Sequence, residues 1–399
     1  MSEKVTIDSR LVTAVCVAVL AIVLAVGLSP FVAPVNEVSW LAGRNGLAFG
    51  HRGSAISAAP FHAVGDGSSA TLELSLQPFS SRGTYTVFSF EGLGTRVPPF
   101  SLQQHGPGLE VRRHNIDDGG TDRIGVFEVA NVFHAETPVF LTVALQPQKT
   151  IVYVNGAQAA EEPISGLSQN NFTGRMVLAD SPITSDGWPG EMFHVAIFGR
   201  ELSAQQVAAR YAARNSAGSS PTAAEESPLA LYRMSEGSGS VVRNEINSAT
   251  NLGISSRYRV LHVPFLLAPQ KEFRNTRQYW QDFGINLLGF IPFGFCFAAW
   301  FSGSGMRWPV LATIALGFAT SLTIESLQVL LPTRDSSMTD LLNNTAGTAI
   351  GALLFTAPLT KRILRSIFPW IFKQKARQSR PLNRITELEM VTSDSARLP

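Results

Sequence analysis

The stretch IESLQVLLPTRDSSMTDLLNNTAG, residues 324–347, decides the fold because it joins two long apolar runs through a polar centre. Its polar side chains are three acids, one arginine and three amides: Glu325, Gln328, Arg334, Asp335, Asp340, Asn343 and Asn344. Apolar segments of about 17–25 residues can cross a membrane as helices, and charges within them are rare and costly. The stretch therefore predicts two spanning helices whose polar ends meet at one membrane face.

Four segments are apolar and long enough to span a membrane. They cover residues 11–33, 285–301, 308–331 and 338–358. The apolar run of the first exceeds that of a secretory signal peptide, and Pro34 follows its only small-residue site. We expect this first segment to be retained as a helix of the mature protein.

Basic residues mark three places as cytoplasmic by the positive-inside rule. They lie in residues 1–10, at Arg307 between the second and third segments, and in residues 359–399 after the fourth. This places residues 34–283 outside, with both termini in the cytoplasm. We expect a multi-pass protein of a bacterial inner (plasma) membrane with a periplasmic or extracellular domain. The formal net charge of +2 gives no reason to expect a nucleic-acid partner.

The region between the first two segments has the pattern of an all-β domain. Stretches such as ATLELSLQPF (70–79) and KTIVYVNG (149–156) alternate apolar and polar residues, and turn-forming residues separate them. Many short strands of this kind indicate a sandwich or jelly roll. The only cysteines, Cys16 and Cys296, lie in membrane segments, so this domain must be stable without disulfides.

Three motifs in this region carry a resemblance to a known family. They are TVALQPQKTIVYVNGAQ (142–158), FTGRMVLAD (172–180) and GWPGEMFHVAIFGRELSAQQVAARY (187–211). In this order they resemble the laminin-G-like, concanavalin A-type sandwich domain over about residues 39–211. The stretch LALYRMSEGSGSVVRNEINSATNLGIS (229–255) looks like the opening strand of such domains. We therefore expect residues 212–270 to hold a linker with a returning strand that completes the sandwich.

The resemblance implies a glycan or protein ligand for this domain. Tyr85 and Trp188 are the aromatic candidates for sugar contacts, although Trp188 also fits a core residue in a Trp-Pro-Gly turn. Asp180 and Asp186 have the hard oxygen atoms that calcium prefers, but they also fit simple turn residues. We predict no cofactor and no metal, with calcium at these two aspartates as the alternative.

The spacing of polar residues on the last three segments predicts a pocket. Residues one helical turn apart share a face, and the polar positions of the three segments fall at the same depth. The candidate substrate-binding residues are Asn286, Glu325, Gln328, Arg334, Asp340, Asn343 and Asn344. Glu325 is the candidate catalytic acid or base, and Arg334 could clamp an anionic head group at the rim. In the alternative interpretation, Asp340 caps a helix and the amides hold helices together.

The same segments carry a second resemblance. NLLGFIPFGF (286–295), followed by residues 324–351, resembles the VanZ-like membrane family over residues 275–358. The matching positions are Asn286, Phe290, Pro292, Gly294, Glu325, Gln328, Pro332, Arg334, Asp340, Asn343 or Asn344, Gly347 and Gly351. The resemblance implies that residues 11–33 form the first helix of a four-helix transmembrane bundle into which the sandwich is inserted. It implies a role at the cell envelope and no particular reaction.

The basic tail permits two interpretations. Its apolar and basic residues could form an amphipathic helix on anionic lipid. They could also be simple positive-inside anchors with an aromatic belt, which is the interpretation we favour for the sequence. We expect disorder after about residue 380.

Two hypotheses of function follow, and the sequence leaves open whether the protein is an enzyme. In the first, a cell-envelope membrane protein uses its sandwich to bind a glycan or protein, in cell-wall or polysaccharide processes. In the second, a membrane enzyme or transporter uses an outer-leaflet polar pocket for an anionic lipid-linked substrate.

Overall fold

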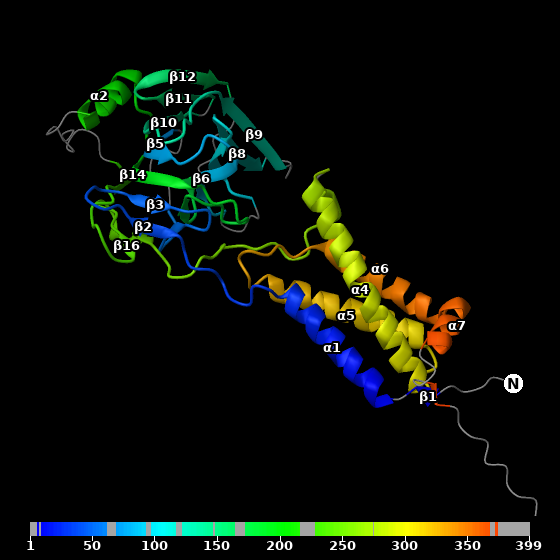
Figure 1. Cartoon of the computed structure of the whole chain (residues 1–399). Helices are drawn as coiled ribbons and strands as arrows, with labels where there is room; N and C mark the ends of the chain where they lie inside the picture. Colours follow the sequence, from blue (N-terminus) through cyan, green and yellow to red (C-terminus); the bar gives the residue numbers. More distant parts are fainter. Residues whose placement is uncertain are drawn as a thin grey trace, which may run out of the picture. The chain divides into compact units, whose positions relative to one another are not determined.

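The computed structural model of the 399-residue chain describes residues 6–7, 9–61, 69–92, 97–116, 122–146, 148–163, 172–215, 228–273, 275–367 and 372–373. The chain divides into two compact units, coloured along the sequence in Figure 1. The sandwich unit comprises Ala25–Asn275 and Leu322–Leu341. The helical unit comprises Met1–Leu24, Thr276–Ser321 and Leu342–Pro399.

The first sheet of the sandwich is antiparallel, in the order β12-β11-β10-β5-β14-β3-β2, and β15 also pairs with β14. Alternate residues of its strands fill the core, as Leu72, Leu74 and Leu76 do on β5. The strands are β2 (Val38–Trp40), β3 (Leu47–Phe49), β5 (Ala70–Pro78), β10 (Val139–Leu145), β11 (Thr150–Val154), β12 (Ala157–Glu162), β14 (Gly190–Phe198) and β15 (Ala230–Tyr232).

The second sheet is also antiparallel, in the order β16-β17-β4-β13-β6-β7-β8-β9. Its inner face supplies a cluster of phenylalanines to the core, in which the rings of Phe88 and Phe90 meet edge to face. The strands are β4 (Ala55–Ser57), β6 (Thr84–Phe90), β7 (Phe100–His105), β8 (Gly108–Ile116), β9 (Asp122–Val129), β13 (Met176–Leu178), β16 (Val241–Val242) and β17 (Leu252–Gly253). Two antiparallel sheets around one core confirm the predicted β-sandwich, while jelly-roll connectivity stays a prediction.

The chain returns to the sandwich after helix α2 (Ala204–Asn215). In the returning segment β15 pairs with the end of β14, where Tyr232 lies opposite Val195. The Tyr232 ring is fully buried, and its hydroxyl donates to the carbonyl oxygen of Thr250 at 2.6 Å. Farther on, β16 and β17 extend the second sheet. The described strands of the sandwich therefore run from Val38 to Gly253.

Five helices accompany the sandwich: α1 (Ser9–Gly27), α4 (Arg277–Gly303), α5 (Pro309–Gln328), α6 (Met338–Thr356) and α7 (Pro358–Ile367). A short helix, α3 (Pro269–Glu272), precedes α4. The predicted first helix ends at Gly27 rather than at residue 33, since the proline at position 30 disfavours helical backbone just before it. Within the described residues, three helices are long and apolar enough to cross a membrane, namely Arg10–Gly27, Tyr279–Gly303 and Pro309–Gln328.

Glycines let α4 and α6 approach closely inside the helical unit. A Cβ atom added to Gly347 would lie 2.1 Å from the carbonyl oxygen of Leu287, and one added to Gly351 would lie 2.1 Å from that of Ile291. Neither distance is compatible with a side chain at the glycine. The predicted close approach at this glycine pair is therefore confirmed, and α4 is the neighbouring helix.

Candidate functional site

The candidate acid Glu325 is buried near the end of α5 and bonds the start of α6. Glu325 is 1% exposed, and its Oε2 accepts a hydrogen bond from the main-chain N–H of Ser337 at 2.7 Å. The Ser336 hydroxyl is a second partner. The Ser337 hydroxyl in turn accepts from the N–H of Asp340 at 3.0 Å, as an N-cap residue does. Glu325 and Ser337 thus satisfy main-chain donors at the N-terminus of α6.

Gln328 and Arg334 bond the end of α1. Gln328 Nε2 donates to the carbonyl oxygen of Gly27 at 2.8 Å. The Arg334 guanidinium donates through Nε to the carbonyl of Ser29 at 2.9 Å and through a terminal nitrogen to that of Val26 at 3.3 Å. Carbonyl groups at a helix C-terminus lack partners within the helix, and these two side chains donate the missing hydrogen bonds.

The segment before α4 covers the loop between α5 and α6. Main-chain hydrogen bonds join Leu267 to Ser336 at 2.9 Å and Met338 to Leu267 at 3.1 Å. The Thr339 hydroxyl donates to a carboxylate oxygen of Glu272. Together with the 1% exposure of Glu325, these contacts close the place where an open pocket was expected.

The candidate amides Asn286, Asn343 and Asn344 belong to the helical unit. Asn344 is buried on α6 and donates through Nδ2 to the Ser321 hydroxyl of α5 at 2.9 Å. Asn343 is also buried, and Asn286 lies half-buried on α4. The structure therefore joins Asn344 to α5, while Glu325, Gln328 and Arg334 gather around main-chain groups of the sandwich unit. Asp340 lies half-buried in the first turn of α6.

Trp188 is a core residue, as the core interpretation of its Trp-Pro-Gly turn held, and its candidate role in sugar contacts is wrong. Trp188 is fully buried in the sandwich core, and its indole Nε1 donates to Gln104 Oε1 at 2.7 Å. Tyr85 is half-buried, packs against the same core, and its ring centroid lies 5.3 Å from that of His51. The Trp-Pro-Gly turn thus directs the indole inward.

Asp180 and Asp186, the calcium alternative, lie in the loop between β13 and β14. Asp186 Oδ2 accepts from the Thr86 hydroxyl at 2.9 Å, and Asp180 Oδ1 accepts from the N–H of Ser181 at 2.8 Å. Burial raises the pKa of both carboxyl groups. Within the described residues no three acidic, histidine or cysteine side chains gather as a metal would require, and calcium at this loop stays a prediction.

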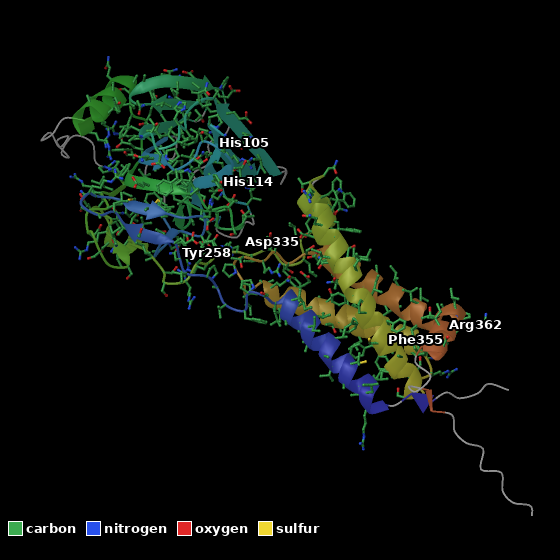
Figure 2. All side chains as sticks on the ribbon, in the orientation of Figure 1. His105, His114, Tyr258, Asp335, Phe355 and Arg362 are labelled. Carbon is green, nitrogen blue, oxygen red and sulfur yellow. The ribbon has the colours of Figure 1, made fainter. Side chains whose placement is uncertain are left out.

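Tyr258 fills the space beside Asp180, at the point where the chain leaves the sandwich (Figure 2). Its ring is fully buried, and its N–H donates to the carbonyl of Pro34 at 2.9 Å. Burial and, after it, the neighbouring Asp180 raise the pKa of the phenol. Tyr258 therefore fastens the outgoing chain to the incoming chain at the base of the sandwich.

The outer side of the second sheet carries a cluster that the sequence interpretation missed. We call it the polar face and define it by Thr86, Gln103, His105, Glu110 and Arg112. Strand register places Thr86, Gln103 and Glu110 in one cross-strand row, and Gln103 Nε2 donates to the Thr86 hydroxyl at 3.2 Å. Arg112 pairs with Glu110 at 2.6 Å and keeps its side chain 40% exposed. Period-2 alternation of β7 and β8 is the signal that could have found this face.

A second polar network holds α2 against the first sheet. Glu73 on β5 is 1% exposed, and its carboxylate accepts from Arg210 Nε at 2.7 Å and pairs with His194 Nε2 at 2.8 Å. Burial alone would raise the pKa of Glu73, but the hydrogen bonds and charges of His194 and Arg210 outweigh it and lower the pKa to about 2. With both partners only 13% exposed, this network supports the fold and offers no open site.

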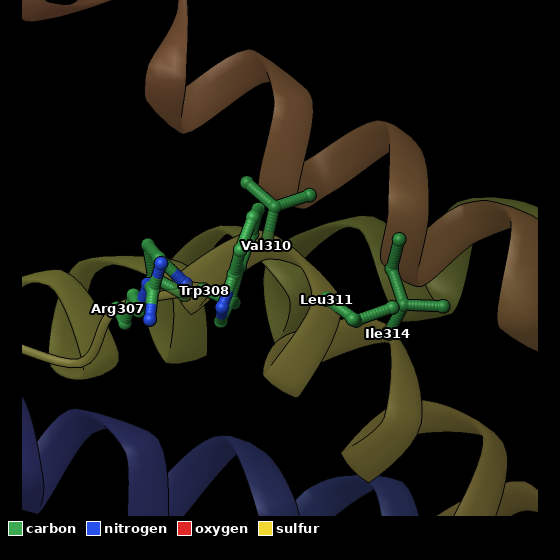
Figure 3. A pocket seen from close by; sticks show the side chains of 6 residues that line it. Arg307, Trp308, Val310, Leu311 and Ile314 are labelled. Carbon is green, nitrogen blue, oxygen red and sulfur yellow. The ribbon is translucent and has the colours of Figure 1, made fainter.

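A shallow apolar hollow lies at the start of α5 (Figure 3). Its walls include Trp308, Val310, Leu311 and Ile314, and the Arg307 guanidinium lies 5.5 Å from the Trp308 ring centroid. Trp308 and Leu311 are both more than 60% exposed, as lipid-facing side chains of a membrane helix would be. We assign this hollow no chemistry.

Two family models match the chain. Residues 50–208 match the concanavalin A-like lectin/glucanases superfamily, through its laminin-G-like model. Residues 234–362 match VanZ/LLP1. The chain therefore combines a laminin-G-like sandwich with a VanZ-like region, as the two resemblances implied.

Comparison with curated proteins finds no match. Among solved structures, a Bacteroides ovatus protein to which carbohydrate binding has been ascribed is 16% identical, with a TM-score of 0.36. The alignment covers 56% of this chain and 58% of that one. The CBM40 of a Ruminococcus gnavus sialidase, bound to sialyllactose, is 12% identical over 36% of this chain and 82% of that one, with a TM-score of 0.30. The binding domain of botulinum neurotoxin DC is 12% identical over 45% of each chain, with a TM-score of 0.33.

Proposed function

We propose that this chain is an envelope-anchored binding protein of a bacterial plasma membrane, whose extracytoplasmic sandwich binds a glycan through the polar face. The observation that carries the proposal is the row of donors and acceptors formed by Gln103, Glu110 and Arg112, in which the Arg112 side chain is 40% exposed and that of Glu110 is 6% exposed. Such a row suits a polyhydroxyl ligand, since each hydroxyl can both donate and accept. The match to a lectin and glucanase superfamily supports the same ligand class.

The anchor in this proposal has four crossings, the fourth being α6. This helix has 19 residues, about 28 Å at 1.5 Å per residue, which approaches a hydrocarbon core of about 30 Å. Leu287 faces Gly347 and Ile291 faces Gly351, so α6 runs parallel to α4 at the same depth. Its polar residues explain why hydropathy alone does not select it.

Pairing of the two chain ends supports an even number of crossings. Strand β1 (Thr6–Ile7) pairs with β18 (Phe372–Lys373) within the helical unit. Two paired strands lie on one side of a membrane, whereas three crossings would leave them on opposite sides. The basic residues near both ends favour the cytoplasmic side.

The alternative function, an enzyme or transporter for an anionic lipid-linked substrate, needs Glu325 and Arg334 to face a ligand. Glu325 instead accepts a hydrogen bond from the Ser337 N–H, and Arg334 donates to carbonyls at the end of α1. These contacts favour a structural role for both residues. In this proposal, the sandwich serves cell-wall or polysaccharide processes.

A glycan array probed with the full-length protein in lipid nanodiscs tests the proposal. We expect binding to a defined glycan class that falls about tenfold in the Arg112→Ala variant, a loss typical of one buried contact. Arg44→Ala is the matched control, because Arg44 also forms an ion pair, with Glu191, but on the other sheet. Absence of glycan binding by the folded wild type, or equal loss in both variants, would contradict the proposal.

A further inference from the structure

Helix α7 is an amphipathic helix that is separate from α6. Only Ala357 lies between the end of α6 at Thr356 and the start of α7 at Pro358. A proline at the first position of a helix suits a new helix and cannot continue the main-chain hydrogen bonds of the previous one. Figure 1 shows α7 turning away from α6 within the helical unit. The chain therefore changes direction where the proposed fourth crossing ends.

The two sides of α7 differ in chemistry. By helical spacing, positions 359, 363 and 367 share a face made of Leu and Ile, positions 361 and 365 fall on the opposite side, and Arg362 falls at the border between the two. Leu359 is 68% exposed and Ile363 is 47% exposed, so the described part of the chain leaves these two apolar side chains uncovered. Arg362 is exposed as well (Figure 2).

The charges of α7 indicate what covers the apolar face. A helix with one apolar face and a basic opposite face binds in the interface of anionic bilayers, with the apolar side in the acyl boundary and the cations among head groups. At 10 residues, or about 15 Å, α7 is too short to cross the membrane. Its position directly after α6 places it at the membrane surface.

We propose that α7 lies flat on the cytoplasmic leaflet, with Leu359 and Ile363 in the acyl boundary and with positions 361, 362 and 365 holding anionic phospholipid head groups. This inference rests on the proposed crossing by α6 and goes beyond ligand binding by the sandwich. It gives the anchor a preference for the lipid composition of one leaflet.

Fluorescence quenching in nanodiscs tests the placement. An NBD label is attached to Ile363→Cys and, as the matched control, to Arg362→Cys in the full-length protein, with the background of Cys16 and Cys296 measured on wild type. Spin-labelled lipids with a shallow nitroxide should quench the label at 363 at least about threefold more than the label at 362. Equal quenching at both positions, or cross-linking of two copies through position 363, would overturn the proposal.

Two further arms separate the causes of a failure. Replacing Lys361, Arg362 and Arg365 by Gln, or omitting anionic lipid, should reduce quenching at 363, and unchanged quenching would overturn the role of charge. A membrane-impermeant thiol reagent should modify Arg362→Cys only from the cytoplasmic side. Modification from outside would reject the four-crossing topology, and with it this placement of α7, even if the sandwich still binds its ligand.

Discussion

The interior of the sandwich and the loop between α5 and α6 both bury charged side chains, but they provide different partners for them. In the sandwich, Glu73 is bonded by the side chains of His194 and Arg210. At the loop, Glu325 and Arg334 bond main-chain groups at the ends of helices. Main-chain groups at helix ends lack partners within the helix, and side chains can supply those partners. A cluster of polar residues in an apolar segment can therefore be a set of helix caps.

The largest expected effect is on the sandwich side of this comparison. Glu73→Gln removes the buried carboxylate and leaves His194 and Arg210 without their anion, which should destabilise the fold by about 3–5 kcal/mol. Thermal unfolding of the full-length protein in detergent measures the loss. Glu161→Gln is the control, because its pair with Lys149 is 40% exposed and should contribute less than about 1 kcal/mol. Similar losses in both variants would contradict the assignment.

The same residue predicts a pH dependence. The pKa of Glu73 falls from an ordinary value of 4.5 to about 2 on folding, so its stabilisation is complete above about pH 4.5 and is lost as the pH falls to about 2. The difference in melting temperature between wild type and Glu73→Gln should shrink across this window. A difference that stays constant down to pH 2 would show that the carboxylate is not responsible.

A smaller effect is expected where α4 and α6 touch. Gly347→Ala places a methyl group against the Leu287 carbonyl and should destabilise the helical unit by about 1–3 kcal/mol. Gly289→Ala is the matched control, since nothing lies within 4 Å of its added Cβ. Melting of detergent-solubilised protein separates the two. If Gly347→Ala melts like Gly289→Ala, the close packing is wrong.

Removing the Arg334 guanidinium should destabilise the protein by about 1 kcal/mol, because this half-exposed group donates hydrogen bonds to two carbonyls. Arg334→Ala should increase hydrogen exchange at the end of α1. Thr6–Ile7 and the rest of the helical unit should keep their exchange rates. Loss of function with unchanged exchange at α1 would favour the ligand-clamp alternative.

The last prediction concerns Asp180, because Asn has the same shape and removes only the charge. A pKa raised by burial means that ionisation opposes folding, so wild type loses stability relative to Asp180→Asn as the pH rises above the ordinary value of 3.8. The melting-temperature difference should therefore grow from pH 4 toward neutrality in favour of the variant. Calcium that stabilises wild type and not the variant would instead support a metal at this loop.

The sandwich could be predicted because its signals are local. Alternation marks the strands, and Asn155 and Gly156 adopt φ values of 53° and 81°, as the hairpin turn at that pair requires. Likewise, the spacing of Gly347 and Gly351 predicted a close helix contact without naming the partner. Both features depend on residues a few positions apart in the sequence.

The spacing of residues alone could not show whether the predicted pocket is open. Helical periodicity places Glu325 and Gln328 on one face, but their partners are main-chain groups at Ser337 and Gly27. The covering segment around Leu267 comes from the linker, which has no helical pattern. Sequence periodicity describes faces of elements, whereas this site depends on how irregular segments lie over them.

Glycan binding by three forms of the full-length protein tests the central claim most directly. The claim is that the polar face of the sandwich holds the ligand and that Glu325 supports the helices. Binding to the glycan selected on the array should fall about tenfold in Arg112→Ala and stay at the wild-type level in Glu325→Gln, provided that each variant is folded in nanodiscs. Retained binding in Arg112→Ala together with loss in Glu325→Gln would contradict the claim.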